Sequence, residues 1–200
     1  HTSAHVLVHH RYVATPSDPS TSRSGESYYK FAARAWRGSF RKGLAAETER
    51  QRRVDAPTYR HPYVTYVGGA AGFVALAWSI GGPIGAAIYV ALATFSTSQL
   101  LLSDYIQHYG LMRSKIDGKY EPVSTRHSWN SPHRLSSAIM LNAPRHSDHH
   151  AHPSLPYNTL IIPEDCPMLP RSLPVMACLA LAPRSWRKIM DPLAAQLSVK

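Results

Sequence analysis

Cysteine is scarce in this sequence of 200 residues: Cys166 and Cys178 are the only two, and they do not form a CxxC pair. This scarcity argues against a disulfide framework and against a zinc site built from cysteines. Acidic residues are also few, 12 against 22 lysines and arginines, so the formal net charge is +10. A basic chain can bind nucleic acid, but that function would leave the uncharged segment and the clustered histidines described below unexplained. We therefore expect no nucleic-acid partner.

Charge is absent altogether from one long segment. No Asp, Glu, Lys or Arg occurs from His61 through Ser103, a run of 43 residues. Because a bilayer core about 30 Å thick needs roughly 20 helical residues per crossing, the run has room for two crossings. The Gly-Gly-Pro sequence at residues 81–83 is a turn signal in its middle. The pattern predicts a transmembrane helical hairpin at about residues 63–102.

The two ends of such a hairpin lie on the same side of the membrane. Four arginines precede it between residues 50 and 60, and three basic residues follow it between residues 113 and 119. By the positive-inside rule, both flanks are expected to face the cytoplasm. The alternative is a buried helical hairpin in a soluble core, which we disfavour because such cores rarely need so long a charge-free run.

Histidine, by contrast, is abundant, with 12 residues. Seven of these form an HxxxHH motif, a single histidine after the uncharged run, and an HxxHH motif: His5, His9, His10, His108, His146, His149 and His150. Residues three or four apart share a helix face. Imidazole is the commonest metal ligand, and a site without cysteine suits iron or zinc better than copper(I). Seven ligands exceed one tetrahedral ion, so the motifs predict two metals.

The remaining histidines are expected to be bystanders, namely His1, His61, His133 and His152, whereas the role of His127 in the run HSWNS stays open. Metal-bound histidines usually donate their second N–H to a carboxylate or carbonyl. Asp148 lies inside the HxxHH motif, Asp104 lies one helical turn before His108, and Asp18 lies in a proline-flanked loop. We expect these carboxylates to support the ligands, although a turn-forming role is the alternative for Asp18.

Four stretches of this sequence resemble the membrane-bound alkane monooxygenases, a non-heme di-iron family of the fatty-acid-desaturase-like superfamily. They are HVLVHHRYVATPSDPSTSRSGE at residues 5–26, YIQHYGLMRSKIDGKYE at 105–121, RHSWNS at 126–131 and RHSDHHAHP at 145–153. The resemblance covers residues 1–160 and implies an all-α integral membrane protein with a cytoplasmic, histidine-rich di-iron cap. Residues 161–200 are expected to form a proline-rich, largely irregular C-terminal tail.

The resemblance further implies an activity. Such enzymes hydroxylate the terminal carbon of an alkane to a primary alcohol, using O2, two non-heme iron ions and two electrons from a rubredoxin-type donor in the bacterial inner membrane. Membrane lipid is therefore a further expected partner. The family holds its irons with nine histidines, and the seven motif histidines match. The other two belong to an upstream box, so we expect this chain to be a C-terminal fragment, inactive alone.

Three positions depart from the family pattern. Gln107 stands where the family usually has Glu, Asp104 where it has Asn, and Pro144 where it has Gln. Gln107 is expected beside the ligand His108 but cannot supply a negative charge, whereas Asp104 can. Two alternatives follow: a desaturase or hydroxylase of fatty-acyl or aromatic substrates with the same iron pair, or an inactive truncated relative.

Overall fold

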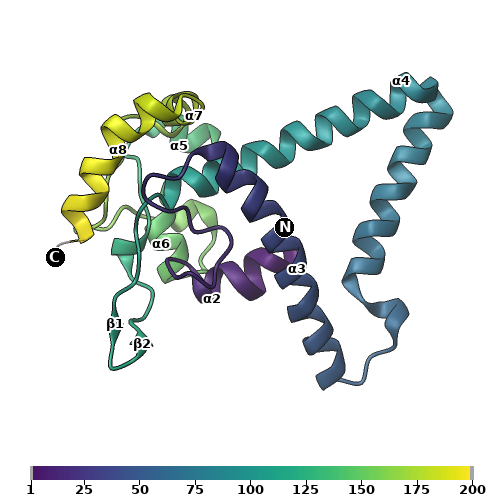
Figure 1. The fold of residues 1–200 in the computed structure, drawn as a ribbon, viewed down its shortest axis with the longest axis horizontal. Helices are drawn as coiled ribbons and strands as arrows, with labels where there is room; N and C mark the ends of the chain where they lie inside the picture. Colours follow the sequence, from purple (N-terminus) through teal and green to yellow (C-terminus); the bar gives the residue numbers. More distant parts are fainter. Residues whose placement is uncertain (1, 199–200) are drawn as a thin grey trace.

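The computed structural model describes residues 2–198, and these are mostly helical (Figure 1). Two long helices, α3 (Tyr28–Arg53) and α4 (Pro62–Gln107), dominate it. The shorter elements before, between and after them are α1 (Thr2–Ala4), the π-helical turn η1 (His5–His9), α2 (His10–Tyr12), the 3-10 turn η2 (Thr58–Arg60), the antiparallel pair β1 (Lys115–Ile116) and β2 (Lys119–Tyr120), the 3-10 turn η3 (Thr125–His127), α5 (Arg134–Ile139), α6 (His146–Ala151), the 3-10 turn η4 (Tyr157–Thr159), α7 (Leu173–Ala180) and α8 (Pro183–Ser198).

Helix α4 is interrupted at Gly81 and Gly82. The backbone angles of Gly82, φ +59° and ψ −153°, are accessible to glycine and strained for other residues. Pro83 follows and cannot donate a helical hydrogen bond. The halves of α4 diverge from this point, and the second half leads into the compact part of the molecule (Figure 1). The interruption lies at the turn signal of the sequence.

The surface of α4 is apolar and largely uncovered. Among the described residues it is the one helix long and apolar enough to cross a membrane, and 6% of its most apolar 18-residue window is buried. Large side chains such as Phe73, Ile84 and Phe95 are more than half exposed. A helix in a soluble core would bury such side chains, whereas the described residues leave these uncovered.

Helix α3 brings the N-terminal histidine segment and the start of α4 together. Its N-cap is Ser27, whose hydroxyl accepts a hydrogen bond from the backbone of Lys30. Three elements meet at Gly43, since a Cβ added there would clash with the Tyr63 hydroxyl and lie 3.1 Å from the Ala4 Cβ. Glycine at this position therefore permits α1 and α4 to pack against the same stretch of α3.

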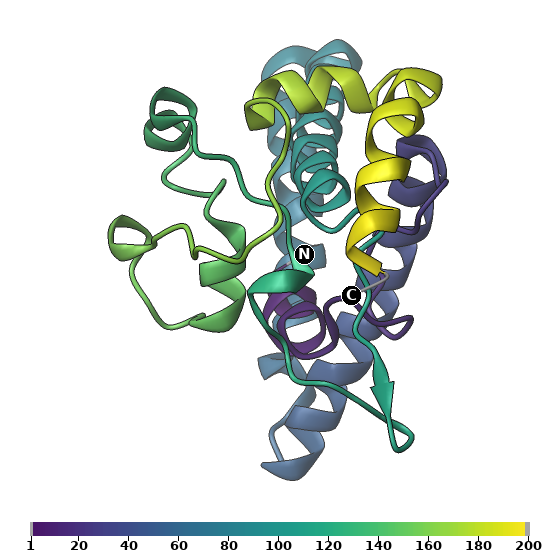
Figure 2. The same cartoon turned by 90° about the vertical axis from the view of Figure 1, so that its left-hand side faces the viewer.

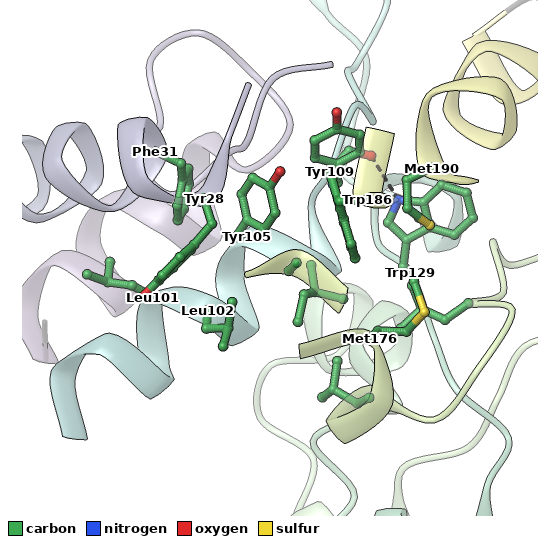
Figure 3. Close-up of a cluster of buried hydrophobic side chains, with 14 of the residues drawn as sticks. Tyr28, Phe31, Leu101, Leu102, Tyr105, Tyr109, Trp129, Met176, Trp186 and Met190 are labelled. Atoms are coloured by element: carbon green, nitrogen blue, oxygen red, sulfur yellow. Dashed lines mark hydrogen bonds between the residues drawn. The ribbon is translucent and has the colours of Figure 1, made fainter. Parts of the chain in front are cut away.

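An aromatic core fills the space between α3, the end of α4, α7 and α8 (Figure 3). Trp186 and Met190 of α8 are fully buried there, and the Trp186 ring lies 5.2 Å from both the Tyr105 and the Tyr109 rings. The expectation of a largely irregular tail is therefore wrong for residues 173–198. The prolines did not prevent helix formation, because Pro174 and Pro183 lie in the first turns of α7 and α8. The backbone N–H that proline lacks has no hydrogen-bond partner within the helix at these positions. Helix α7 packs against α4, and α8 packs against α7 (Figure 2).

Candidate metal centre

The N-terminal ligand candidates lie on a widened helical turn. The His10 amide donates to the His5 carbonyl, which is an i to i+5 hydrogen bond of a π-helix. Single π turns often occur at functional sites. Here the turn brings the Nε2 atoms of His5 and His10 within 3.1 Å of each other. A regular α-helix would place His5 beside His9 instead, so the sequence spacing alone does not show this arrangement.

The structure brings all seven motif histidines together, although they come from three distant stretches of chain. His108 caps the end of α4, and the HxxHH histidines lie on α6. The seven divide into two adjacent groups, each with its candidate ligand atoms within 4.8 Å of one another. The four-histidine group is buried and consists of His9, His108, His146 and His150; the three-histidine group is half-buried and consists of His5, His10 and His149.

The nitrogen spacing in the four-histidine group suits a metal ion. The Nε2 atom of His146 lies 3.0 Å from that of His108 and 3.1 Å from that of His150. Imidazole nitrogens bound at roughly 2.1 Å and at right angles to one another would be about 3.0 Å apart. The Nε2 atom of His9 is buried and has no hydrogen-bond partner among residues 2–198. A cation would satisfy these converging lone pairs, so the residues fit a metal.

The protonation states suit ligands as well. Burial lowers the pKa of His108, His146 and His150 well below the ordinary histidine value. Burial and the neighbouring imidazoles lower the pKa of His5 to about 3 and that of His10 to about 4. These rings are neutral at pH 7, and neutral imidazole is the form that binds metal.

His9 differs because it has a carboxylate partner. Burial alone would lower its pKa, but the charge of Asp18 and a 2.8 Å hydrogen bond from Nδ1 to Asp18 raise it. Asp18 is itself held by the Thr21 hydroxyl at 2.7 Å and the Ser20 amide at 3.0 Å. With Nδ1 engaged in this way, Nε2 of His9 is directed to the four-histidine group.

The other three predicted supporting residues are placed differently. Asp148 accepts hydrogen bonds from His152 and from the Ile161 amide rather than from a clustered histidine. At 100° per residue, it lies on the opposite face of α6 from His146. Gln107 donates its amide hydrogen to the Ala143 carbonyl at 2.8 Å. For Asp104, burial raises the pKa to about 6, with the opposing charge of His9 nearby.

Three of the histidines expected to be bystanders are described by the structure, and all three lie outside both groups. His61 contacts Thr48, His152 contacts Asp148, and His133 precedes α5, while His1 lies outside the described residues. His127, whose role the sequence leaves open, contributes its backbone carbonyl, which lies 3.4 Å from Nδ1 of His108. No side-chain motif could reveal a contact of this kind.

The pKa shifts predict acid sensitivity of the metal-free protein. The unfolded chain binds protons on these imidazoles below about pH 6.5, whereas the folded chain resists protonation of His5 and His10 until about pH 3 to 4. The free energy of unfolding should therefore fall as the pH is lowered from 7.5 to 5. Thermal unfolding in detergent measures this trend. A variant with both His5→Gln and His10→Gln should show a flatter dependence; a wild-type midpoint that stays constant with pH would contradict it.

A model of the fatty acid desaturase family matches residues 1–160, the part that contains both histidine groups. The chain belongs to the fatty acid desaturase family. The superfamily resemblance drawn from the sequence motifs is thus confirmed.

This desaturase-family chain is also similar to curated proteins. It is 38% identical over 196 residues to an alkane 1-monooxygenase of Pseudomonas putida, covering 94% of the chain and 48% of the relative. It is 36% identical to alkane 1-monooxygenase 2 of Pseudomonas aeruginosa, over 94% of the chain and 51% of the relative. It is 28% identical to the xylene/toluene monooxygenase hydroxylase component of Pseudomonas putida, over 92% of the chain and 49% of the relative. The chain thus spans about half the length of the curated relatives it matches.

Proposed function

We propose that this protein acts as a membrane non-heme di-iron monooxygenase that hydroxylates the terminal carbon of alkanes to primary alcohols with O2 and two electrons. The observation that carries the proposal is the pair of adjacent groups made of histidine alone, one of four members and one of three. The similarity to alkane 1-monooxygenases over 94% of the chain supports the choice of reaction.

The two histidine groups would hold two iron ions. Iron supplies the redox change that O2 activation and an unactivated C–H bond require and that zinc lacks. The four-histidine group would supply four imidazole ligands to one iron, and the three-histidine group would supply three to the other. Because the four-histidine group is buried, it would exclude bulk water and keep its imidazoles neutral.

The apolar helix α4 would form a transmembrane hairpin around the break at Gly81 and Gly82. Its uncovered apolar side chains support this placement, because lipid would cover them. The basic flanks support a position of the histidine groups on the cytoplasmic side, which would be that of the bacterial inner membrane. An alkane dissolves in the same bilayer and would reach the iron pair from it.

A charge placed in this hairpin tests the membrane proposal. Leu92 in the second half of α4 is 61% exposed. Leu92→Lys should lower membrane insertion more than tenfold, because a charged residue at the centre of a span costs about 2.5–3.5 kcal/mol. Leu92→Ala is the matched control and should insert almost normally. Carbonate extraction of membranes measures the inserted fraction, and equal insertion of both variants would argue against a span here.

Electrons would come from a small acidic protein of the rubredoxin type. The surplus of ten positive charges outside the uncharged segment would attract such a donor. The same charges would also contact anionic lipid headgroups. Raising the ionic strength should therefore slow reduction by the donor, since screening weakens exposed charge pairs.

Product analysis tests the proposed reaction. The full-length protein, reconstituted in nanodiscs with iron and a rubredoxin-type donor, is supplied in turn with a medium-chain alkane, a fatty acid and xylene. A primary alcohol from the alkane is the expected product. Predominant conversion of the fatty acid to an unsaturated acid, or of xylene to its alcohol, would overturn the assignment of substrate. No turnover by an iron-loaded protein would overturn the assignment as an enzyme.

A further inference from the structure

We infer that residues 127–130 position the four-histidine group, with Trp129 and Asn130 as the positioning residues. This segment lies between two ligand-bearing parts of the chain, the end of α4 and the start of α6. The inference rests on the proposed function only in that the four-histidine group binds a metal. It concerns how His108 and α6 are held at the right distance from each other.

The first half of the segment fixes His108. The Trp129 amide donates to the Gln107 carbonyl at 2.8 Å, and the Trp129 indole donates to the Tyr109 carbonyl at 2.8 Å (Figure 3). These two bonds bracket His108 on both sides along the chain. They also satisfy carbonyls at the C-terminal end of α4, which have no partner within the helix.

The same segment sets which nitrogen of His108 faces the metal group. The His127 carbonyl lies 3.4 Å from Nδ1 of His108, where it accepts the ring N–H. Nε2 of His108 then presents its lone pair toward His146. The backbone of His127, rather than its side chain, has this effect, since its imidazole pairs with Glu121.

The second half of the segment fixes α6. The Asn130 side chain forms two hydrogen bonds with Ser147. Its Oδ1 accepts from the Ser147 amide at 2.9 Å, and its Nδ2 donates to the Ser147 hydroxyl at 2.6 Å. The Ser147 hydroxyl in turn contacts the Ser128 carbonyl at 2.9 Å. Ser147 lies in the first turn of α6, next to His146, where amides lack helical partners.

Helix α6 depends on such external contacts because it is short. It has six residues, and isolated helices of that length are unstable in water. Its rotation decides whether His146 and His150 point at His108. Asn130 and Ser147 are completely buried. Since a buried amide is costly unless it is hydrogen-bonded, these contacts specify one orientation of α6.

Cobalt(II) binding to the full chain tests the inference without relying on catalysis. Co(II) absorbs in the visible range, and the intensity and position of its bands depend on its coordination geometry, so both the affinity and the geometry of the site can be read from a titration. Asn130→Asp replaces the donor facing the Ser147 hydroxyl by an oxygen while conserving shape. It should weaken Co(II) binding at the four-histidine group by at least tenfold and lower the intensity of the visible band, because it leaves buried groups unpaired.

Asn142→Asp is the matched control. The Asn142 side-chain amide donates a hydrogen bond to the Tyr157 carbonyl, and Asn142 contacts neither Ser147 nor the clustered histidines through this bond. It should leave the titration unchanged. Circular dichroism of each metal-free variant checks folding. If Asn130→Asp does not fold, Trp129→Phe provides the test, since it keeps an aromatic ring and loses one indole hydrogen bond. A roughly threefold to tenfold loss of affinity is expected from that single bond.

Folded Asn130→Asp or Trp129→Phe protein that binds Co(II) with wild-type affinity and spectrum would overturn the inference. If these variants also hydroxylate alkanes normally, the proposed function still holds. Conversely, the expected Co(II) losses in a protein that forms no alcohol would support the positioning role and overturn the proposed function. No Co(II) binding by the wild-type four-histidine group would overturn both.

Discussion

Replacing His146 with alanine should reduce the iron content of the full-length protein from two ions to at most one and abolish hydroxylation. The Nε2 atom of His146 lies between those of His108 and His150, at 3.0 and 3.1 Å, so this ring is the centre of the four-histidine group. Its loss leaves three imidazoles around an enlarged space. Iron analysis of purified protein and alcohol formation from an alkane measure the two effects.

The control for this substitution is His152→Ala. His152 is also near α6, but its ring pairs with Asp148 and lies outside both histidine groups. Its side chain is 60% exposed. Iron content and product formation should therefore be close to wild type. Two irons per chain in the His146→Ala variant, or a loss of iron in His152→Ala, would show that the ligands are assigned wrongly.

Replacing Trp186 with alanine should cost about 3–5 kcal/mol of unfolding free energy, the range found for removing a large aromatic ring from a core. Trp186 is completely buried and packs against the rings of Tyr105 and Tyr109. Since Tyr109 follows the ligand candidate His108, we also expect weaker metal binding. Denaturant unfolding in detergent measures the stability.

Trp36→Ala is the comparison, because Trp36 on α3 is 56% exposed and removing it leaves no cavity in the core. The change in unfolding free energy should be several times smaller than for Trp186→Ala. Equal effects of the two substitutions would mean that α8 does not belong to the core around the end of α4. Residues 161–200 would then act as a separate tail, as the sequence suggests.

Much of the arrangement could be predicted because it depends on local patterns. The uncharged run and its Gly-Gly-Pro sequence predict a transmembrane helical hairpin with its turn at residues 81–83, and the structure interrupts α4 at Gly81 and Gly82. The histidine motifs predict the seven side chains that the structure brings together. Asp18, chosen as a possible partner for a ligand, contacts His9.

The remaining features depend on contacts between distant residues. The division into four and three histidines requires the π turn at His5–His9 and the tertiary position of His108. Helices α7 and α8 could not be predicted from composition, because the prolines in their first turns resemble those of an irregular segment. The contact between Asn130 and Ser147 joins residues 17 apart, and neither belongs to a metal-ligand pattern by itself.

Gln107 illustrates how a departure from the family pattern can be compensated. Its side chain is buried, and its amide donates to the Ala143 carbonyl, next to Pro144. A glutamate in its ionised form could not donate this bond. The departures at residues 107 and 144 thus lie close together, and here Gln107 ties the end of α4 to the segment that leads into α6.

X-ray absorption at the iron edge, combined with iron and protein quantitation, tests the central claim most directly. The sample is the full-length protein purified without oxygen and loaded with iron. We expect two irons per chain, with a first shell of nitrogen or light atoms and the outer-shell scattering of imidazole, since both groups consist of histidine alone. Binding of a single ion, a sulfur shell, or an absence of imidazole scattering would contradict the claim that these seven histidines hold an iron pair.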